Sequence, residues 1–124
     1  MDMPELRKRL MVVFIEELHE CVGDMDRHLR SLQQNPEPQV REMLKNELYR
    51  AAHKMKGAAN AAQVPPIERL CRQMQDILIS VRDGQRTIDD RLHSQFMDAV
   101  TFLRASEALL RNGHAPTSGD SIFG

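Results

Sequence analysis

The sequence from Arg50 to Asn60 reads Arg-Ala-Ala-His-Lys-Met-Lys-Gly-Ala-Ala-Asn. Alanines and straight-chain side chains dominate this stretch, and it contains no proline and no β-branched residue, so it predicts a helix. At about 100° per residue, the helix and the turns around it have two distinct faces. The apolar face belongs in a core and consists of Leu44, Leu48, Ala51, Met55, Ala58 and Ala62. The second face is polar and consists of Tyr49, His53, Lys56, Gly57 and Asn60.

The rest of the chain shows the same helical spacing of apolar residues. We expect helices over about residues 5–34, 39–62, 66–82 and 88–111. The inward residues of the first are Leu6, Leu10, Val13, Phe14, Leu18, Cys21, Val22, Met25, Leu29 and Leu32, and Val40 joins the apolar face of the second. Those of the third and fourth are Ile67, Leu70, Cys71, Met74, Ile77, Leu78, Val81, Leu92, Phe96, Ala99, Val100, Leu103 and Leu110. Four such helices with short connectors predict an all-α fold, an antiparallel up-and-down four-helix bundle.

Proline and glycine mark the connectors and the end of the bundle. The connector after the second helix includes Pro65 and Pro66, and we expect Pro66 to open the third helix. Thr87 and Asp90 have the spacing of a capping box at the start of the fourth helix. We assign residues 1–113 to the bundle. Residues 114–124 contain Pro, Ser and Gly without periodicity, so we expect a flexible tail or the start of a linker.

Composition excludes several classes of function. The net charge is −1 and only 4% of residues are aromatic, so nothing favours binding to nucleic acid. The longest apolar run, residues 10–15, is too short to span a membrane, and no membrane partner is expected. Cys21 and Cys71 lie on predicted apolar faces, where buried reduced thiols in the cytoplasm are expected.

The polar face around His53 has the chemistry of a nucleophilic site. A neutral imidazole is a good nucleophile, and Lys56 lies one turn away to neutralise negative charge. Gly57 costs the helix about 1 kcal/mol relative to alanine, which indicates close approach by another molecule. The four other histidines, His19, His28, His93 and His114, lack such a setting and are expected on the surface.

The segment from His53 to Ala58 resembles the H-x-x-K-G signature of histidine phosphotransfer (Hpt) domains. The next predicted helix, residues 67–78, resembles the helix that packs beside the phosphohistidine helix in that family. Residues 14–29 resemble the N-terminal Hpt domain of chemotaxis-type, CheA-like histidine kinases. The resemblance covers about residues 5–112. It implies a phosphoryl carrier rather than an enzyme, with His53 phosphorylated.

The resemblance also implies partners and further site residues. The phosphoryl group would be exchanged with an aspartate of a response-regulator receiver domain, and a histidine-kinase ATP-binding domain, in cis or in trans, would supply it. Gln75 stands where the family keeps Gln or Glu, and its side-chain oxygen can accept from Nδ1–H of His53, which leaves Nε2 to attack. Lys56 would neutralise the phosphoryl charge. We expect Gly57, Lys54, Asn60 and Tyr49 on the partner-binding face.

Two departures from the family pattern concern the subfamily. Gln63 stands where the family often has a second glycine, and Arg72 stands where chemotaxis kinases often have a second histidine. With Gln75, this pattern favours a relay or a hybrid CheA-like kinase over a simple chemotaxis kinase. An alternative function is a non-phosphorylated helical adaptor that binds a receiver domain or a kinase.

A metal-binding bundle enzyme is the third hypothesis. Glu16-x-x-His19 matches half of a carboxylate-bundle motif, but the second half is absent. We therefore expect no metal site and no cofactor.

Overall fold

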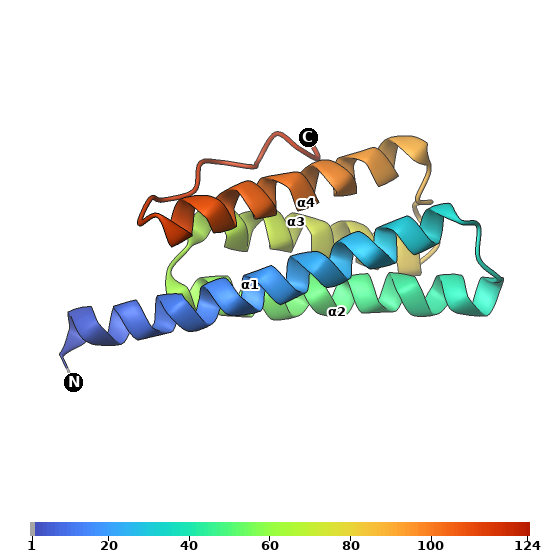
Figure 1. Cartoon of the computed structure of the whole chain (residues 1–124). Helices are drawn as coiled ribbons and strands as arrows, with labels where there is room; N and C mark the ends of the chain where they lie inside the picture. The colour runs from blue at the N-terminus through green and yellow to red at the C-terminus, as the bar shows by residue number, and fades with distance from the viewer. Residues whose placement is uncertain (1) are drawn as a thin grey trace.

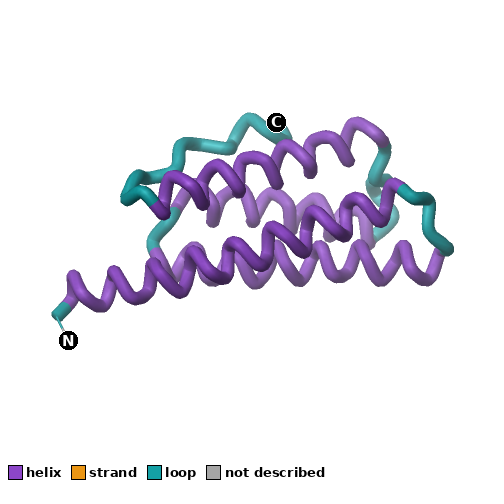
Figure 2. Tube along the Cα trace, viewed as in Figure 1, coloured by secondary structure: helices purple, strands orange, loops and turns teal. Residues whose placement is uncertain are grey.

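The computed structural model describes residues 2–124 as four antiparallel helices (Figure 1). In chain order these are α1 (Met3–Gln33), α2 (Pro38–Ala62), α3 (Pro65–Arg82) and α4 (Asp90–Arg111). Their connectors alternate between the two ends of the bundle (Figure 2). α2 packs against α1 and α3, whereas α2 and α4 lie diagonally opposite. The predicted fold class, an all-α antiparallel four-helix bundle, is confirmed. Within the described part of the chain, no helix combines the length and apolar character needed to cross a membrane.

Aspartate side chains cap the first turns of α1 and α4. The backbone N–H of Glu5 donates to Asp2 Oδ1 at 2.9 Å, and that of Leu92 donates to Asp89 Oδ1 at 2.8 Å. The predicted capping box of Thr87 and Asp90 is therefore wrong. Asp89 is itself the N-cap, because its short carboxylate accepts from a free N–H of the first turn. α4 consequently starts two residues later than predicted, at Asp90, and α3 starts one residue earlier, at Pro65.

The connector between α2 and α3 is a tight left-handed turn. Gln63 adopts φ 60° and ψ 53°, a conformation that glycine usually occupies. The N–H of Val64 donates to Ala59 O at 2.9 Å, and the N–H of Gln63 donates to Asn60 O at 3.2 Å. These two bonds are those of a Schellman motif, and the buried Val64 and Ala59 make its apolar part. Gln63 thus makes a turn for which glycine is the usual residue.

Gln63→Gly should stabilise the protein by about 0.5–1 kcal/mol, because glycine adopts the left-handed conformation without the steric cost of a Cβ atom. Urea unfolding followed by circular dichroism measures the difference. Gln63→Ala is the control: it keeps the Cβ atom and should stay within about 0.5 kcal/mol of the parent protein. A glycine variant no more stable than the alanine variant would show that the turn carries no such cost.

The core is built of aliphatic and methionine side chains from all four helices. Most predicted inward residues are buried, and those with no exposed surface include Leu18, Met25, Leu29, Leu48, Met55, Leu70, Met74, Phe96 and Leu103. All of them belong to one continuous cluster. The predicted apolar stripes are confirmed over the central turns of the helices.

Four predicted core residues are instead exposed. Leu6 is 39% exposed, Leu10 45% and Val13 55%, and Val40 in the first turn of α2 is 42% exposed. Figure 1 shows the reason for α1, whose first turns extend past the ends of the neighbouring helices. An apolar stripe is buried only where another helix reaches it.

The small residues of α2 are rotated by one position from the prediction. Ala52 and Ala59 are fully buried, whereas the predicted Ala51 and Ala58 are half-buried and flank the core. α2 is covered by α1 on one side and by α3 on the other, so its buried strip lies between the two. The thiol of Cys21 on α1 donates to the backbone oxygen of Ala51 at 3.6 Å.

The two cysteines are free and buried, as predicted. Burial raises the pKa of the Cys21 thiol to about 11, with a smaller contribution from the nearby Asp24. Burial raises the pKa of Cys71 still further, and the proximity of Cys21 adds to that shift. Both side chains therefore act as small apolar groups of the core.

His93 is not the surface residue that the sequence predicted. It is only 7% exposed, and its Nε2–H donates to the backbone oxygen of Leu29 at 2.8 Å. This bond joins α4 to α1 and satisfies a polar group that burial would otherwise leave without a partner. His28 is half-buried, while His19 and His114 are exposed.

Residues 114–124 lie back along α4 instead of leaving the bundle (Figure 1). The ring of Phe123 packs edge-to-face on Phe96, with centroids 5.1 Å apart. Arg69 of α3 donates to Asp120 Oδ1 at 3.3 Å, so the segment contacts both α3 and α4. Gly119 is buried, and a Cβ atom there would come within 3.2 Å of the Phe102 ring. The segment whose composition predicts a flexible tail or the start of a linker thus contacts the core through two apolar residues near its end, Ile122 and Phe123.

Phe123→Ala should lower the free energy of unfolding by about 1–2 kcal/mol, because it removes a half-buried aromatic side chain and its contact with Phe96. Thermal or urea unfolding is the measurement. Ser121→Ala, at an exposed neighbouring position, should change stability by less than about 0.5 kcal/mol. Equal stability of both variants and the parent protein would mean that the segment adds nothing to the fold.

Candidate functional site

The candidate site lies on the outward face of α2. Leu48, Ala52, Met55 and Ala59 turn inward, which places His53 on the opposite, exposed side of the helix. A side chain fixed on a rigid helix in this way is accessible to another molecule and is not part of the core. The imidazole of His53 is therefore exposed to solvent and can be reached by a reactant.

Gln75 of α3 contacts the imidazole directly. Its Oε1 lies 3.4 Å from Nδ1 of His53. A carboxamide oxygen can only accept, so in this contact Nδ1 is the donor. In a neutral imidazole of that tautomer the lone pair lies on Nε2. The structure thus brings together the two residues that the sequence analysis paired across the α2–α3 turn.

Tyr49 stacks against the same imidazole from one turn away on α2. The two rings are nearly parallel, with centroids 6.0 Å apart and planes inclined by 13°. The guanidinium carbon of Arg82, in the last turn of α3, lies 5.6 Å from the centroid of the Tyr49 ring. With Lys45 and Leu78, Tyr49 and Arg82 line a small pocket of about 210 Å³ beside the site.

The sequence analysis did not identify Arg82. The available signal was its spacing, because it follows Gln75 by seven residues, which is two turns and so the same face of α3. Tyr49, which the sequence predicts on the partner-binding face, is half-buried and stacks on His53.

The surface beside His53 is open and positively charged. Lys54 is exposed and Lys56 half-buried, and neither forms an ion pair with any residue that the structure describes. A Cβ atom added to Gly57 would meet nothing within 4 Å, so packing inside the domain does not require this glycine. Asn60, one turn on, is exposed as well. Arg72, which precedes Gln75 by one turn of α3, is paired with Glu68.

No group of three or more potential metal ligands occurs among residues 2–124. The Glu16-x-x-His19 sequence, half of a carboxylate-bundle metal motif, lies on α1. There, His19 Nδ1 lies 3.0 Å from Glu107 Oε2 of α4. Arg111 contacts the same Glu107 at 2.9 Å and Glu16 at 3.6 Å. The acidic groups there are therefore neutralised by a guanidinium.

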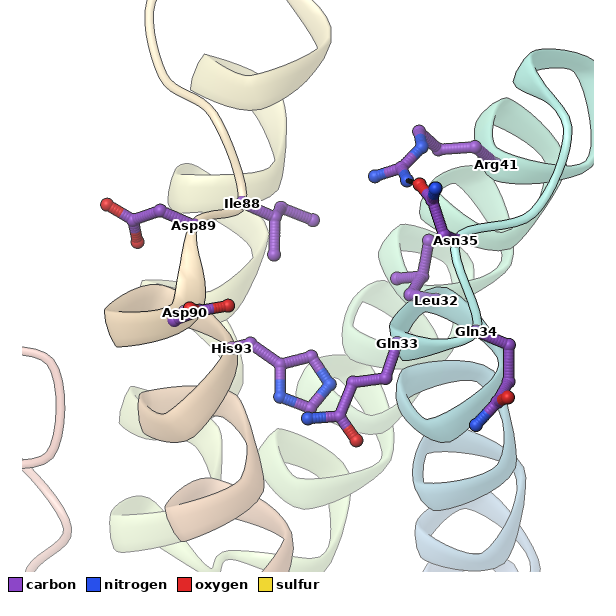
Figure 3. A pocket seen from close by; sticks show the side chains of 9 residues that line it. All are labelled: Leu32, Gln33, Gln34, Asn35, Arg41, Ile88, Asp89, Asp90 and His93. Carbon is purple, nitrogen blue, oxygen red and sulfur yellow. Dashed lines mark hydrogen bonds between the residues drawn. The ribbon is translucent and has the colours of Figure 1, made fainter.

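A pocket of about 530 Å³ is separate from the candidate site. Figure 3 shows it between the end of α1, the start of α2 and the start of α4. His93 and Asp90 line its α4 side, and Arg41, which donates to Asn35 Oδ1 at 2.9 Å, lines its α2 side. None of the residues on the His53 face takes part in it.

The family model described as "Hpt domain" matches residues 9–115. The chain belongs to the Hpt domain family. It is therefore a histidine phosphotransfer module of two-component signalling, and such modules are phosphoryl carriers and not enzymes. The Hpt domain is also similar to the chemotaxis protein CheA of Salmonella typhimurium, with 26% identity over 103 residues. That match covers 83% of this chain but only 15% of the CheA chain.

Proposed function

We propose that His53 is the residue that carries the phosphoryl group, and that it exchanges this group with an aspartate of a response-regulator receiver domain. The observation that carries the proposal is the contact between Nδ1 of His53 and Oε1 of Gln75, 3.4 Å apart, on an otherwise exposed imidazole. With its proton on Nδ1, the ring has its lone pair on Nε2 and needs no base to become a nucleophile.

In the proposed transfer, the lone pair of Nε2 forms a bond to phosphorus while the bond between phosphorus and the donor oxygen breaks. Both electrons of that bond leave with the donor oxygen, and transfer to a receiver aspartate reverses these steps. Phosphoryl transfer depends mainly on positioning and on neutralising the charge of the equatorial oxygens. Lys56, unpaired and one turn from His53, supplies that charge. The Oε1 atom of Gln75 accepts from Nδ1–H of His53 and so keeps the proton on that nitrogen.

The proposed partners are a receiver domain and a histidine-kinase ATP-binding domain, in cis or in trans. Gly57 supports docking at this face, because its missing side chain leaves open surface beside His53. Lys54 and Asn60 border the same surface and are proposed to contact the partner.

His53→Gln should abolish phosphorylation while leaving the helical content unchanged, since the side chain is exposed and outside the core. Phosphoramidate, a small donor that needs no kinase, tests this directly: the label on the parent protein should be acid-labile and alkali-stable, as an N–P bond is. His19→Gln is the control, because His19 is also an exposed histidine and should leave labelling intact. Label retained by the His53 variant would assign the function to another residue. A parent protein that binds a receiver domain but takes no label would be an adaptor.

Gly57→Gln should weaken binding of a receiver domain by filling the open surface, and should raise the stability of the domain by up to about 1 kcal/mol by removing a helical glycine. Calorimetric titration and urea unfolding give the two numbers. The matched control is Ala105→Gln, an exposed position on α4, which lies diagonally across the bundle from α2. Unchanged affinity in the Gly57 variant would remove the glycine from the interface.

A further inference from the structure

Two side-chain contacts join α2 and α3 at the site, at two successive levels along the helices. Gln75 and Arg82 lie on one face of α3, two turns apart, and His53 and Tyr49 lie on one face of α2, one turn apart. Gln75 contacts His53, and Arg82 covers Tyr49. The stack of Tyr49 on His53 closes these contacts into a continuous set of four side chains.

We propose that Tyr49 and Arg82 are positioning residues that fix the plane of the His53 imidazole for phosphoryl transfer. This proposal rests on the proposed function of His53. Tyr49 acts by direct stacking, and Arg82 acts through Tyr49. Neither residue touches the reacting Nε2–phosphorus bond.

The contact with Gln75 is not sufficient to hold the ring. At 3.4 Å it lies at the long end of hydrogen-bond distances, so it orients Nδ1 weakly. The terminal torsion of histidine is broad and roughly two-fold, which lets an exposed imidazole rotate about a single anchored atom. A parallel aromatic ring with centroids 6.0 Å apart, inclined by 13°, restricts this rotation.

Tyr49 is in turn held more firmly than His53. It is half-buried and packs against the core, whereas His53 is exposed. Arg82 lies over its ring at 5.6 Å, and a guanidinium plane suits that role better than an ammonium group does. The side chain of Arg82 is 63% exposed and has only a long 3.6 Å contact with Asp83, so no strong ion pair draws it away from the ring.

The consequence for transfer follows from geometry. Attack on phosphorus requires the Nε2 lone pair to be aligned with the bond that breaks, and a misdirected nucleophile lowers the rate without altering binding of the donor. Loss of the Tyr49 ring should therefore reduce the maximal rate of His53 phosphorylation by about tenfold and leave the half-saturating donor concentration unchanged.

The test measures phosphorylation of the full chain by phosphoramidate, together with NMR spectra of the His53 ring in the unphosphorylated protein. Tyr49→Phe should keep the rate and the ring-current shift of the His53 protons, because it keeps the aromatic face. Tyr49→Leu should lose both, and its core should survive since leucine packs on the same neighbours. Arg82→Gln should reduce the rate by a smaller factor, and the double variant with Tyr49→Leu should be no slower than Tyr49→Leu alone.

Arg69→Gln is the matched control, because it removes an α3 arginine that pairs with Asp120 and does not contact Tyr49. It should match the parent protein in rate and in the His53 spectrum. A folded Tyr49→Leu variant that is phosphorylated at the parent rate would overturn the proposal, as would a Tyr49→Phe variant as slow as Tyr49→Leu. If the parent protein takes no label, the proposed function fails, and unchanged His53 shifts in Tyr49→Leu would separately refute the positioning role.

Discussion

The left-handed turn at Gln63 and Val64 determines how α2 and α3 face each other. Its two hydrogen bonds and the burial of Val64 fix where α2 ends and at what angle the chain returns. His53 and Gln75 lie at similar distances along the chain on either side of this turn, and each helix rises by about 1.5 Å per residue. The two side chains therefore meet at the same height. A shift of one residue in this turn would rotate Gln75 by about 100° away from the imidazole.

Ion pairs engage some of the surface charges of the bundle and leave others free. On the α1–α4 side, Asp26 pairs with Arg30 and Arg104, and Glu107 pairs with His19 and Arg111. Such exposed pairs add little to stability. On the α2 side, Lys54 and Lys56 have no ion-pair partner among the described residues, as the salt-bridge pattern shows. These two cations, on the side of the bundle that carries His53, thus remain available to a negatively charged group.

The sequence predicted the features that depend on local spacing. The four helices, their central apolar stripes and the placement of His53, Lys56 and Gly57 on one face all follow from a period of about 3.6 residues. The pairing of His53 with Gln75 could be predicted as well, because a short connector leaves little freedom in how two helices run back along each other.

Features that depend on where other elements end could not be predicted in this way. Leu6 and Leu10 continue the apolar stripe of α1, and only the extent of the neighbouring helices leaves them exposed. His93 can be buried because the backbone oxygen of Leu29, distant in sequence, accepts a hydrogen bond from its Nε2–H. Arg82 shares a face of α3 with Gln75, but that spacing does not show that the Tyr49 ring lies beneath its guanidinium, since an arginine at the end of a helix ordinarily remains in solvent.

The two buried cysteines are built-in probes of how often the helices of this domain separate. Only the thiolate reacts readily with an electrophile, and the raised pKa values keep both groups protonated and unreactive while the helices stay packed. A maleimide or disulfide reagent can therefore reach Cys71, which has no exposed surface, only when the bundle separates. The rate of alkylation then reports how often α3 leaves its neighbours, with no probe added to the chain. Comparing the alkylation rate with and without a bound partner would show whether docking at α2 makes the separation of α3 from its neighbours less frequent.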